Sequence, residues 1–233
     1  MTVDFATYCC EKDMDKLHDN FNTHVESHNY KFDNLHLIYQ RCLPEERHGV
    51  FPVISELNIN AHSIFSNMYT DILSSNGINP DNEEADELTH GWNHSHYWKH
   101  HCVNHLVAME KSSADYIVLC DADCYIRNQR PETSWINEGI RILQQNKDAL
   151  LVSPSDGSGQ KKTQTMSQQI FITERKRLQS IDFDLPFTGF KDGGPMQEYY
   201  FMLEGRIGRY MEKHNLYRYI LNDNFRYWHK QWH

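Results

Sequence analysis

The chain has 233 residues, the size of one elaborated domain rather than of two full domains. It carries 32 acidic residues against 23 Lys and Arg, and this net charge of −9 argues against a ligand such as duplex nucleic acid. No apolar run approaches the roughly 18 residues of a membrane-spanning helix, and the N-terminus lacks the basic and apolar segments of a secretory signal. We therefore expect a single cytoplasmic domain with no transmembrane segment.

The six cysteines are too sparse for a disulfide scaffold and contain no Cys-x-x-Cys motif. We expect reduced thiols, several of them buried in strands. The adjacent Cys9 and Cys10 have no obvious basic neighbour that would activate a thiol, so packing is their expected role.

Apolar periodicity predicts strands and helices that alternate along the chain. The first half should contain, in order, a strand over Val3–Cys9, a helix over Lys12–Ser27, a strand over Asn34–Cys42 and a helix over Ala61–Ser74. An acidic surface loop over Ser75–Glu87 and a His-rich helical segment over Gly91–Lys111 should follow. The second half should contain a strand over Ala114–Cys120, a helix over Trp135–Asn146, a strand over Ala149–Ser153 and a mobile connector over Pro154–Thr165. A strand over Gln169–Thr173, a turn over Asp182–Gly194 and a helix over Met196–His214 should complete it. This alternation predicts an α/β fold with a mostly parallel central sheet and helices on both faces.

Two acids follow directly on the most strand-like run of the sequence. Asp121 and Asp123 flank Ala122 at the carboxyl end of this buried strand. Ligands of open α/β sheets bind beyond the carboxyl ends of strands, and paired carboxylates there suit Mg²⁺ or Mn²⁺ bound to a phosphate. For the tripeptide alone, a turn cap is the commoner explanation. A buried apolar strand that runs into two acids favours the cation site, because unpaired charges there are destabilising.

The order of these features resembles the nucleotide-sugar-dependent glycosyltransferases of the GT-A fold, most of all the inverting family-two type. The likeness is carried by Asp115–Asp123 (DYIVLCDAD), by an N-terminal strand that ends near Thr7 and Tyr8, and by Gly193-Gly194-Pro195 ahead of a late helix. It spans nearly the whole chain. The resemblance implies one GT-A-like domain over residues 1–233, with a nucleotide-sugar-binding half (1–123) and an acceptor-binding half with a closing segment (124–233).

The resemblance also implies roles for individual residues on the donor side. Asp123 would be the main ligand of a Mn²⁺ or Mg²⁺ ion that bridges the two phosphates, and Asp121 would face the ribose or the metal. The expected donor-binding residues are Thr7, Tyr8, Glu11, Arg41, Lys99, Asp121 and Asp123. Arg41 lies where the family usually has an acid that reads the base, so the identity of the base stays open.

In inverting members of the family, a carboxylate near the start of a late helix deprotonates the acceptor hydroxyl. Glu198 occupies the matching place, and Asp192 is a second candidate on the same loop. A positioned base contributes roughly 10²–10⁴-fold to such an attack. The alternative is that Glu198 only complements the helix N-terminus. Inversion is preferred and retention stays open, because stereochemistry depends on geometry.

The aromatic and basic C-terminal segment suggests closure over the site. Many GT-A enzymes place a late histidine on the metal, and His229 is the better candidate here than the terminal His233. Arg226 and Lys230 would then be phosphate partners. The alternative is an aromatic tail packed on the body of the protein.

The histidine-rich segment His90–His105 offers two pairs at four-residue spacing, His96 with His100 and His101 with His105. Such pairs can bind zinc, but no His-Glu-x-x-His motif is present and no third ligand is evident. A solvated or acceptor-lining helix is the favoured interpretation. In the family this region lies next to the donor diphosphate, so the resemblance implies a contact from Lys99 or His100.

The sequence therefore predicts a metal-dependent glycosyltransferase that takes a nucleoside-diphosphate sugar, most readily a UDP-sugar, and a glycan or other hydroxyl acceptor. Short basic patches at Lys161-Lys162 and Arg175-Lys176-Arg177 leave peripheral membrane contact open. Two rivals remain. A nucleotidyltransferase should show a Gly-rich basic loop after the first strand, which is missing here, and a non-catalytic metal- or glycan-binding protein would use the histidine-rich segment.

Overall fold

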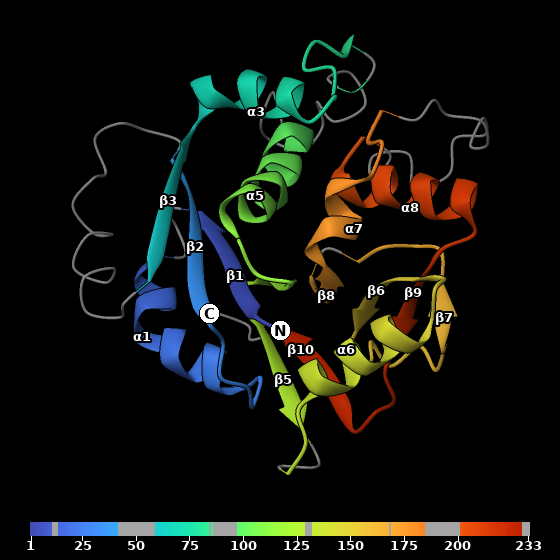
Figure 1. Ribbon diagram of the computed structural model, residues 1–233. Coiled ribbons are helices and arrows are strands. Elements are labelled where there is room, and N and C mark those ends of the chain that lie inside the picture. The colour runs from blue at the N-terminus through green and yellow to red at the C-terminus, as the bar shows by residue number, and fades with distance from the viewer. Residues whose placement is uncertain are drawn as a thin grey trace.

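The structure is a computed structural model that describes residues 1–10, 14–41, 59–83, 85, 97–128, 132–167, 169–184 and 201–229. An eight-stranded sheet runs through it in the order β3-β2-β1-β4-β8-β6-β9-β7 (Figure 1). Its strands are β1 (Val3–Cys10), β2 (Asn34–Arg41), β3 (Asn60–Phe65), β4 (Tyr116–Asp121), β6 (Ala149–Ser153), β7 (Lys162–Thr163), β8 (Ile170–Glu174) and β9 (Tyr217–Ile220). A second, two-stranded sheet pairs β5 (Cys124–Asn128) with β10 (Phe225–His229).

Four of the seven pairings in the large sheet are parallel. Strands β3, β2, β1 and β4 run parallel to one another, and so do β6 and β9. Strand β8 is antiparallel to both of its neighbours, β4 and β6, and β7 is antiparallel to β9. The prediction of a mostly parallel α/β sheet is confirmed. The parallel half brings the carboxyl ends of β1 and β4 to one edge, where a ligand site is expected.

Helices cover both faces of the sheet, as predicted (Figure 1). One face carries α1 (Met14–Glu26) and α6 (Trp135–Gln145). The other carries η2 (Ser66–Met68), α3 (Tyr69–Ser75), α5 (Tyr97–Lys111), α7 (Arg175–Gln179) and α8 (Leu203–His214). None of the described helices is both long and apolar enough to cross a membrane.

Strand β4 shows how the two-residue period of a strand divides the core. Ile117 and Leu119 pack with the helices on the α5 face, whereas Val118 and Cys120 pack on the α6 face. All four side chains are fully buried, and each aliphatic one stabilises the fold by roughly 1.5–3 kcal/mol relative to exposure. Because successive side chains point to opposite faces, Asp121 follows on the α5 face.

The predicted helix Ala61–Ser74 is wrong in its first part. Residues Asn60–Phe65 form β3, which pairs in parallel with β2, and α3 begins only at Tyr69. Ile64 is buried and its strand neighbours are more exposed, a strand pattern that the helical spacing of later apolar residues obscured. The late helix also begins later than predicted, at Leu203, since Phe201 and Met202 lie outside it.

The connector Pro154–Thr165 was expected to be mobile, but contacts fix it to the body of the protein. Ser155 forms a bridge with Arg226, and Arg218 donates a hydrogen bond of 3.4 Å to Asp156. The connector also contains β7, which pairs with β9. The C-terminal segment, expected as a closing segment or a packed tail, contributes the strands β9 and β10.

Candidate active site

The two acids of the Asp-Ala-Asp motif lie where β4 ends and turns into β5. Asp121 is the last residue of β4, and its backbone N–H donates to the carbonyl of Gln169 at 2.8 Å. Asp123 lies in the turn before β5. Strand β10 pairs with β5 so that His229 is opposite Cys124. This register brings the His229 imidazole to Asp123, with 3.2 Å between Nδ1 and Oδ2.

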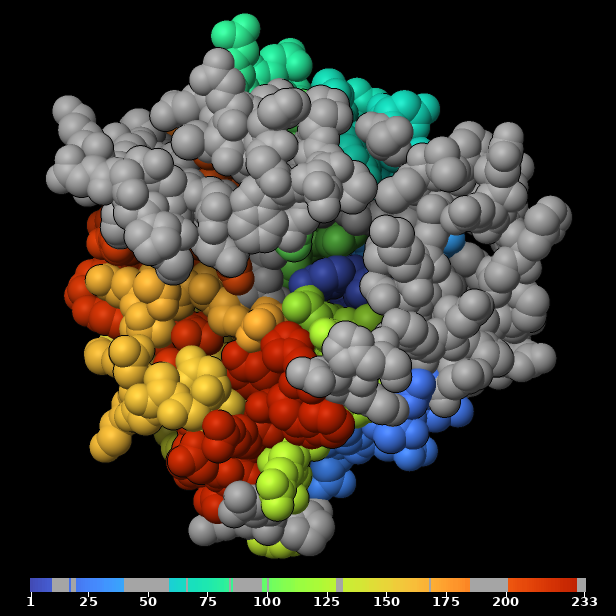
Figure 2. Space-filling view, turned by 180° about the vertical axis from the view of Figure 1, so that it is seen from behind, coloured from blue at the N-terminus to red at the C-terminus, as the bar shows by residue number. Residues whose placement is uncertain are grey.

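The neighbouring strand β1 supplies a second wall. Tyr8 is paired in register with Asp121, and its ring lies against that of His105 on α5, with 4.9 Å between centroids. Figure 2 shows the surface hollowed here: the dark blue of β1 is visible between the green of α5 and the yellow-green of the segment around the β4–β5 turn. The red C-terminal segment that contains β10 borders the same hollow.

The carboxyl group of Asp121 lies where a negative charge is costly. Its Oδ1 atom is covered by protein and has no hydrogen-bond partner in the described part of the chain. Burial raises the pKa of Asp121 well above its usual value, and the nearby Asp123 and Glu204 raise it further. A covered, unpartnered carboxylate oxygen beside two more acids is destabilising without a cation. The donor set of two carboxylates and an imidazole therefore fits a divalent ion.

Cys124 completes a group of three potential ligands with Asp123 and His229, whose ligand atoms all lie within 4.8 Å of one another. The Cys124 sulfur is 3.6 Å from Nδ1 of His229 and is fully buried beneath the other two side chains. Burial raises the pKa of its thiol, and Cys120, Asp121 and Asp123 raise it further, so the ion-free protein holds a thiol. Sequence reasoning missed this residue. The adjacency to Asp123 was visible, but the register of β5 with β10 was not.

Other predicted donor residues are not brought to this point. Thr7 is fully buried on the α1 and α6 face, beside Cys120 rather than Asp121. Lys99 is buried in the first turn of α5, with its ammonium 5.4 Å from the centre of the Trp98 ring. Arg226 lies against Gly157, where a Cβ would approach its guanidinium to 2.6 Å. Of the predicted site residues, the structure thus brings Tyr8, Asp121, Asp123 and His229 to the end of β4.

The remaining predicted residues lie outside the described part of the structure. They are the base candidates Glu198 and Asp192, together with Glu11, Lys230, His233 and the side chain of Arg41. Their roles stay predictions. Most of the histidine-rich segment, up to and including His96, lies outside it as well.

The described histidines of that segment are built into the protein rather than grouped as ligands. His105 is buried, its Nδ1–H donates to the carbonyl of His101 at 3.3 Å, and its ring stacks on Phe171. Among the residues that the structure describes, no group of three metal-binding side chains includes His101 or His105. The pair contributes to the wall behind Tyr8.

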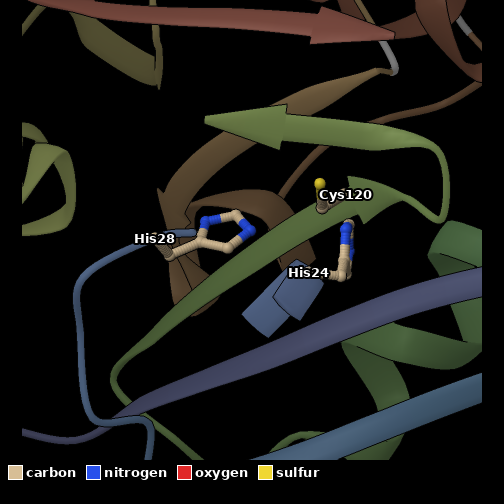
Figure 3. A group of neighbouring side chains, drawn as sticks. All are labelled: His24, His28 and Cys120. Atoms are coloured by element: carbon tan, nitrogen blue, oxygen red, sulfur yellow. The ribbon is translucent and has the colours of Figure 1, made fainter. Parts of the chain in front are cut away.

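A different histidine cluster, which sequence reasoning missed, lies beneath the sheet. His24 from α1, His28 just after α1 and Cys120 from β4 point toward one another (Figure 3), and all three are fully buried. The four-residue spacing of the two histidines on the core face of a helix was the available signal. Trp135 donates its indole N–H to Nδ1 of His28 at 3.1 Å, so the neutral ring carries its proton on Nε2, the atom that faces the cluster.

This tautomer makes His28 a poor metal ligand, because a ligating nitrogen needs its lone pair. Burial lowers the pKa of His24 to about 3 and that of His28 well below its usual value, so both rings are neutral. Their edges pack on Phe5, with ring centroids 5.3 and 4.9 Å apart. We interpret the cluster as a neutral imidazole and aromatic core.

A separate shallow pocket of about 390 Å³ lies at the start of α6. Ser134, Glu138 and Arg141 contribute to its wall, and none of the predicted site residues does. Arg141 already pairs with Glu138 there, so its guanidinium is not free for an anionic ligand.

Comparison with known proteins bears on the fold. No protein-family model matches the sequence, and no curated protein matches it. Among solved structures, mouse xyloside xylosyltransferase 1 superposes with a TM-score of 0.51 at 11% identity over 95% of this chain and 86% of that one.

Two further structures are similar at lower scores. The galactosyltransferase LgtC, in complex with donor and acceptor sugar analogues, has a TM-score of 0.39 at 13% identity, over 77% of this chain and 60% of that one. Glucosyl-3-phosphoglycerate synthase from Mycobacterium tuberculosis has a TM-score of 0.41 at 12% identity, over 77% and 59% of the two chains. The chain thus spans about 60% of the length of these two proteins. At these identities the likeness establishes the fold alone. The chain has the GT-A fold of glycosyltransferases, as the sequence resemblance predicted.

Proposed function

We propose that this protein transfers a sugar from a nucleoside-diphosphate donor to a hydroxyl acceptor with the help of a divalent cation. The observation that carries the proposal is the assembly of Asp121, Asp123 and His229 at the carboxyl end of β4 in a GT-A fold. The unpartnered oxygen of Asp121 supports a positively charged occupant at this place. A diphosphate is the ligand class that a cation held by carboxylates suits best.

Each assembled residue has a task in this proposal. Asp123 and His229 hold the ion from the β5 and β10 side, and Asp121 faces it or the ribose from β4. When bound there, the ion, Mn²⁺ or Mg²⁺ by the family resemblance, would supply positive charge for the leaving diphosphate. Tyr8, whose ring lies in the adjoining wall, borders the nucleoside. Glu11 and Arg41 stay predicted donor contacts of this half of the chain, whereas Thr7 and Lys99 are buried away from this point.

The acceptor half is proposed from the sequence. Glu198 would remove the proton from the acceptor hydroxyl, with Asp192 as the second candidate, and the sugar would be transferred with inversion. A UDP-sugar and a glycan acceptor are the preferred pair. Analysis of the anomeric configuration of the first product formed distinguishes inversion from retention.

A thermal-shift screen with a panel of nucleotide sugars and nucleoside diphosphates, with and without Mn²⁺ or Mg²⁺, tests the donor site. A ligand at 100 times its Kd stabilises the folded state by about 2.7 kcal/mol, which raises the Tm of a chain of this size by roughly 5–10 °C. Asp123→Asn should lose the shift, because the cation loses its main ligand. Asp71→Asn, which changes an exposed acid of α3, should keep it. A panel in which no diphosphate shifts the Tm in the presence of metal contradicts the proposal.

Once a donor is known, Glu198→Gln tests the base. Donor binding should be unchanged, while the transfer rate should fall roughly 10²–10⁴-fold, because the acceptor hydroxyl loses its proton acceptor. Asp192→Asn is the matched variant on the same loop. If transfer is unchanged in Glu198→Gln and falls in Asp192→Asn, the base is Asp192; if both variants are active, the base assignment is wrong.

A further inference from the structure

Cys124 lies against the two side chains that hold the cation in the proposed site. We propose that Cys124 is a third protein ligand of this cation, so that the site selects a thiophilic ion of the zinc type over Mg²⁺. The inference rests on the cation site of the proposed function, but on neither the donor nor the acceptor.

The distances in the ion-free protein already have the spacing of a metal site. Nδ1 of His229 is 3.2 Å from Oδ2 of Asp123 and 3.6 Å from Sγ of Cys124. Tetrahedral zinc, with bonds of about 2.3 Å to sulfur and about 2.0–2.2 Å to nitrogen and oxygen, places its ligand atoms roughly 3.3–3.6 Å apart. One nitrogen therefore lies at ligand spacing from both other donors, and an ion can enter with little rearrangement.

The β5–β10 ladder explains why these donors converge. Five residues of each strand are paired in antiparallel register, from Phe225 opposite Asn128 to His229 opposite Cys124. Directly opposed residues project their side chains on the same side of a ladder, so the sulfur and the imidazole face the same point. Asp123 comes from the turn that leads into β5. The ligands thus depend on a paired strand end rather than on a free loop, which favours a fixed geometry.

The exposure of the three side chains leaves one side of the ion open. Cys124 is fully buried, whereas the Asp123 and His229 side chains are 44% and 38% exposed. The sulfur is thus on the protein side, and the remaining coordination position faces solvent. Three protein ligands with one open position is the arrangement of catalytic rather than structural zinc. In the proposed reaction, a diphosphate oxygen would take that position.

The chemistry of the three donors decides the class of ion. Mg²⁺ prefers six oxygen ligands in octahedral geometry, and a thiolate is a poor ligand for it. A thiolate, an imidazole and a carboxylate together suit Zn²⁺ or Co²⁺. When the ion binds, the sulfur–hydrogen bond of Cys124 is replaced by a sulfur–metal bond, and the proton passes to solvent. A plain hydrogen bond between His229 and Asp123 beside a passive thiol gives similar distances, so the test must report on the sulfur itself.

Cobalt provides that report, since a thiolate bound to Co²⁺ has an intense charge-transfer absorption in the near ultraviolet. The full chain with reduced thiols is titrated with Co²⁺ in the absence of nucleotide. The wild-type protein should show the band at one equivalent, and Cys124→Ser should lack it. Cys120→Ser should keep it, because this buried cysteine lies four residues earlier and belongs to the His24 and His28 cluster. His229→Gln should weaken the band.

Competition gives a second measurement that needs no variant. Zn²⁺ should displace Co²⁺ and abolish the band, whereas a roughly hundredfold excess of Mg²⁺ should not. Replacing residues that only support metal ligands lowers metal affinity 10–100-fold, so Cys124→Ser should lower Zn²⁺ affinity by at least about 10-fold. Circular dichroism and the melting temperature show whether Cys124→Ser is folded. If it is not, the competition in the wild-type protein decides.

Several results overturn the inference. They are a wild-type protein without a charge-transfer band, a band that persists in Cys124→Ser, displacement of Co²⁺ by Mg²⁺ as readily as by Zn²⁺, and a band lost only in Cys120→Ser, which would assign it to the buried cluster instead. The outcome is separable from that of the proposed function. A Cys124-dependent band without any nucleotide binding keeps the metal site and rejects the donor site, and nucleotide binding with Mg²⁺ but no band does the reverse.

Discussion

Asp121 carries the strongest conflict between stability and function at the scale of single residues. Its Oδ1 is covered and has no hydrogen-bond partner among the described residues, and burial raises its pKa. A carboxyl group whose pKa is higher in the folded than in the unfolded state contributes stability at low pH and loses it as the pH rises through the folded-state value. At neutral pH without metal, burial of the Asp121 carboxyl group therefore costs stability.

Asp121→Asn removes the ionisable group, and we expect the metal-free protein to become more stable at neutral pH by roughly 1–3 kcal/mol, because each unit by which burial raises a carboxyl pKa costs about 1.4 kcal/mol. The same variant should lose the metal-dependent Tm shift with nucleotide. Denaturant unfolding in a chelating buffer measures the first effect, and the ligand screen measures the second. Asp123→Asn is the comparison: its side chain is half-exposed, so the gain in stability should be smaller. A metal-free Asp121→Asn protein that is less stable than wild type contradicts the expectation.

Helix α6 packs closely on the sheet where it crosses β8. A Cβ at Gly139 would lie 2.7 Å from Cγ2 of Ile172, below any normal contact, whereas a Cβ at Gly208 of α8 would meet only the Gln164 carbonyl at 3.5 Å. Glycine at position 139 therefore sets how closely α6 approaches the sheet. Glycine at 208 has no such constraint among the described residues.

The two glycines give a matched test at the scale of elements. Alanine raises the intrinsic stability of a helix by roughly 1 kcal/mol over glycine at either position. Overpacking opposes this at Gly139 by roughly 1–3 kcal/mol. Gly208→Ala should thus stabilise the protein by up to about 1 kcal/mol, while Gly139→Ala should destabilise it by up to about 2 kcal/mol. Urea midpoints at unchanged slope measure both, and equal effects at the two positions would show that α6 does not pack as described.

Elements with strong local signals were predictable from the sequence. The helix predicted over Trp135–Asn146 is α6, Trp135–Gln145, because its apolar stripe is regular and Ser134 caps it by accepting a hydrogen bond from the N–H of Ile136. Strand β4 and the acids after it were predicted for a similar reason. Strands β3, β5, β7, β9 and β10 were missed, because two to six residues with weak alternation become strands only through their partners.

The residues of the candidate site likewise divide into those with a strong local signal and those that only tertiary pairing places. Asp121, Asp123 and His229 were predicted from the acidic motif and from the family resemblance, and the structure brings Asp123 and His229 together. Cys124 was missed because its place in the site depends on one register of one tertiary strand pair. The sequence analysis looked for a histidine cluster in the wrong segment. It considered His90–His105, whereas the buried cluster contains His24 and His28, which come together with Cys120 only when α1 packs on the sheet.

The stability of the whole molecule in acid depends on buried side chains that keep one protonation state in the folded protein. His24 and His28 are buried and neutral, with pKa values lowered by burial, to about 3 for His24. Their contribution is complete above the unfolded value of about 6.5 and is lost as the pH falls toward the folded values. Asp4 is buried with hydrogen bonds from Asn34, Ser112 and His36, and its pKa is about 2, so its contribution is lost only in stronger acid.

We therefore expect His24 and His28 to lower stability below about pH 6.5, with a joint contribution to the slope that approaches roughly 2.7 kcal/mol per pH unit, because each ring binds a proton only in the unfolded chain. His62, whose pKa is lowered to about 4, adds to this slope, and Asp121, whose pKa is raised, opposes it. His24→Leu should remove about half of the joint contribution. His214→Gln, which changes an exposed histidine of α8, should leave the slope unchanged. Free energies of unfolding from urea titrations between pH 4.5 and 8 measure the slope, and the same slope in His24→Leu would refute the role of the buried ring.

The pairing of β10 with β5 has a consequence for synthesis. Asp123 and His229 are 106 residues apart in sequence, and the three ligand positions proposed for the cation become complete only at residue 229. During translation, every other described strand of the fold leaves the ribosome before β10 does. A nascent chain can therefore assemble its large sheet while it still lacks the site, so metal capture would report that residue 229 has been made and that β10 has paired with β5.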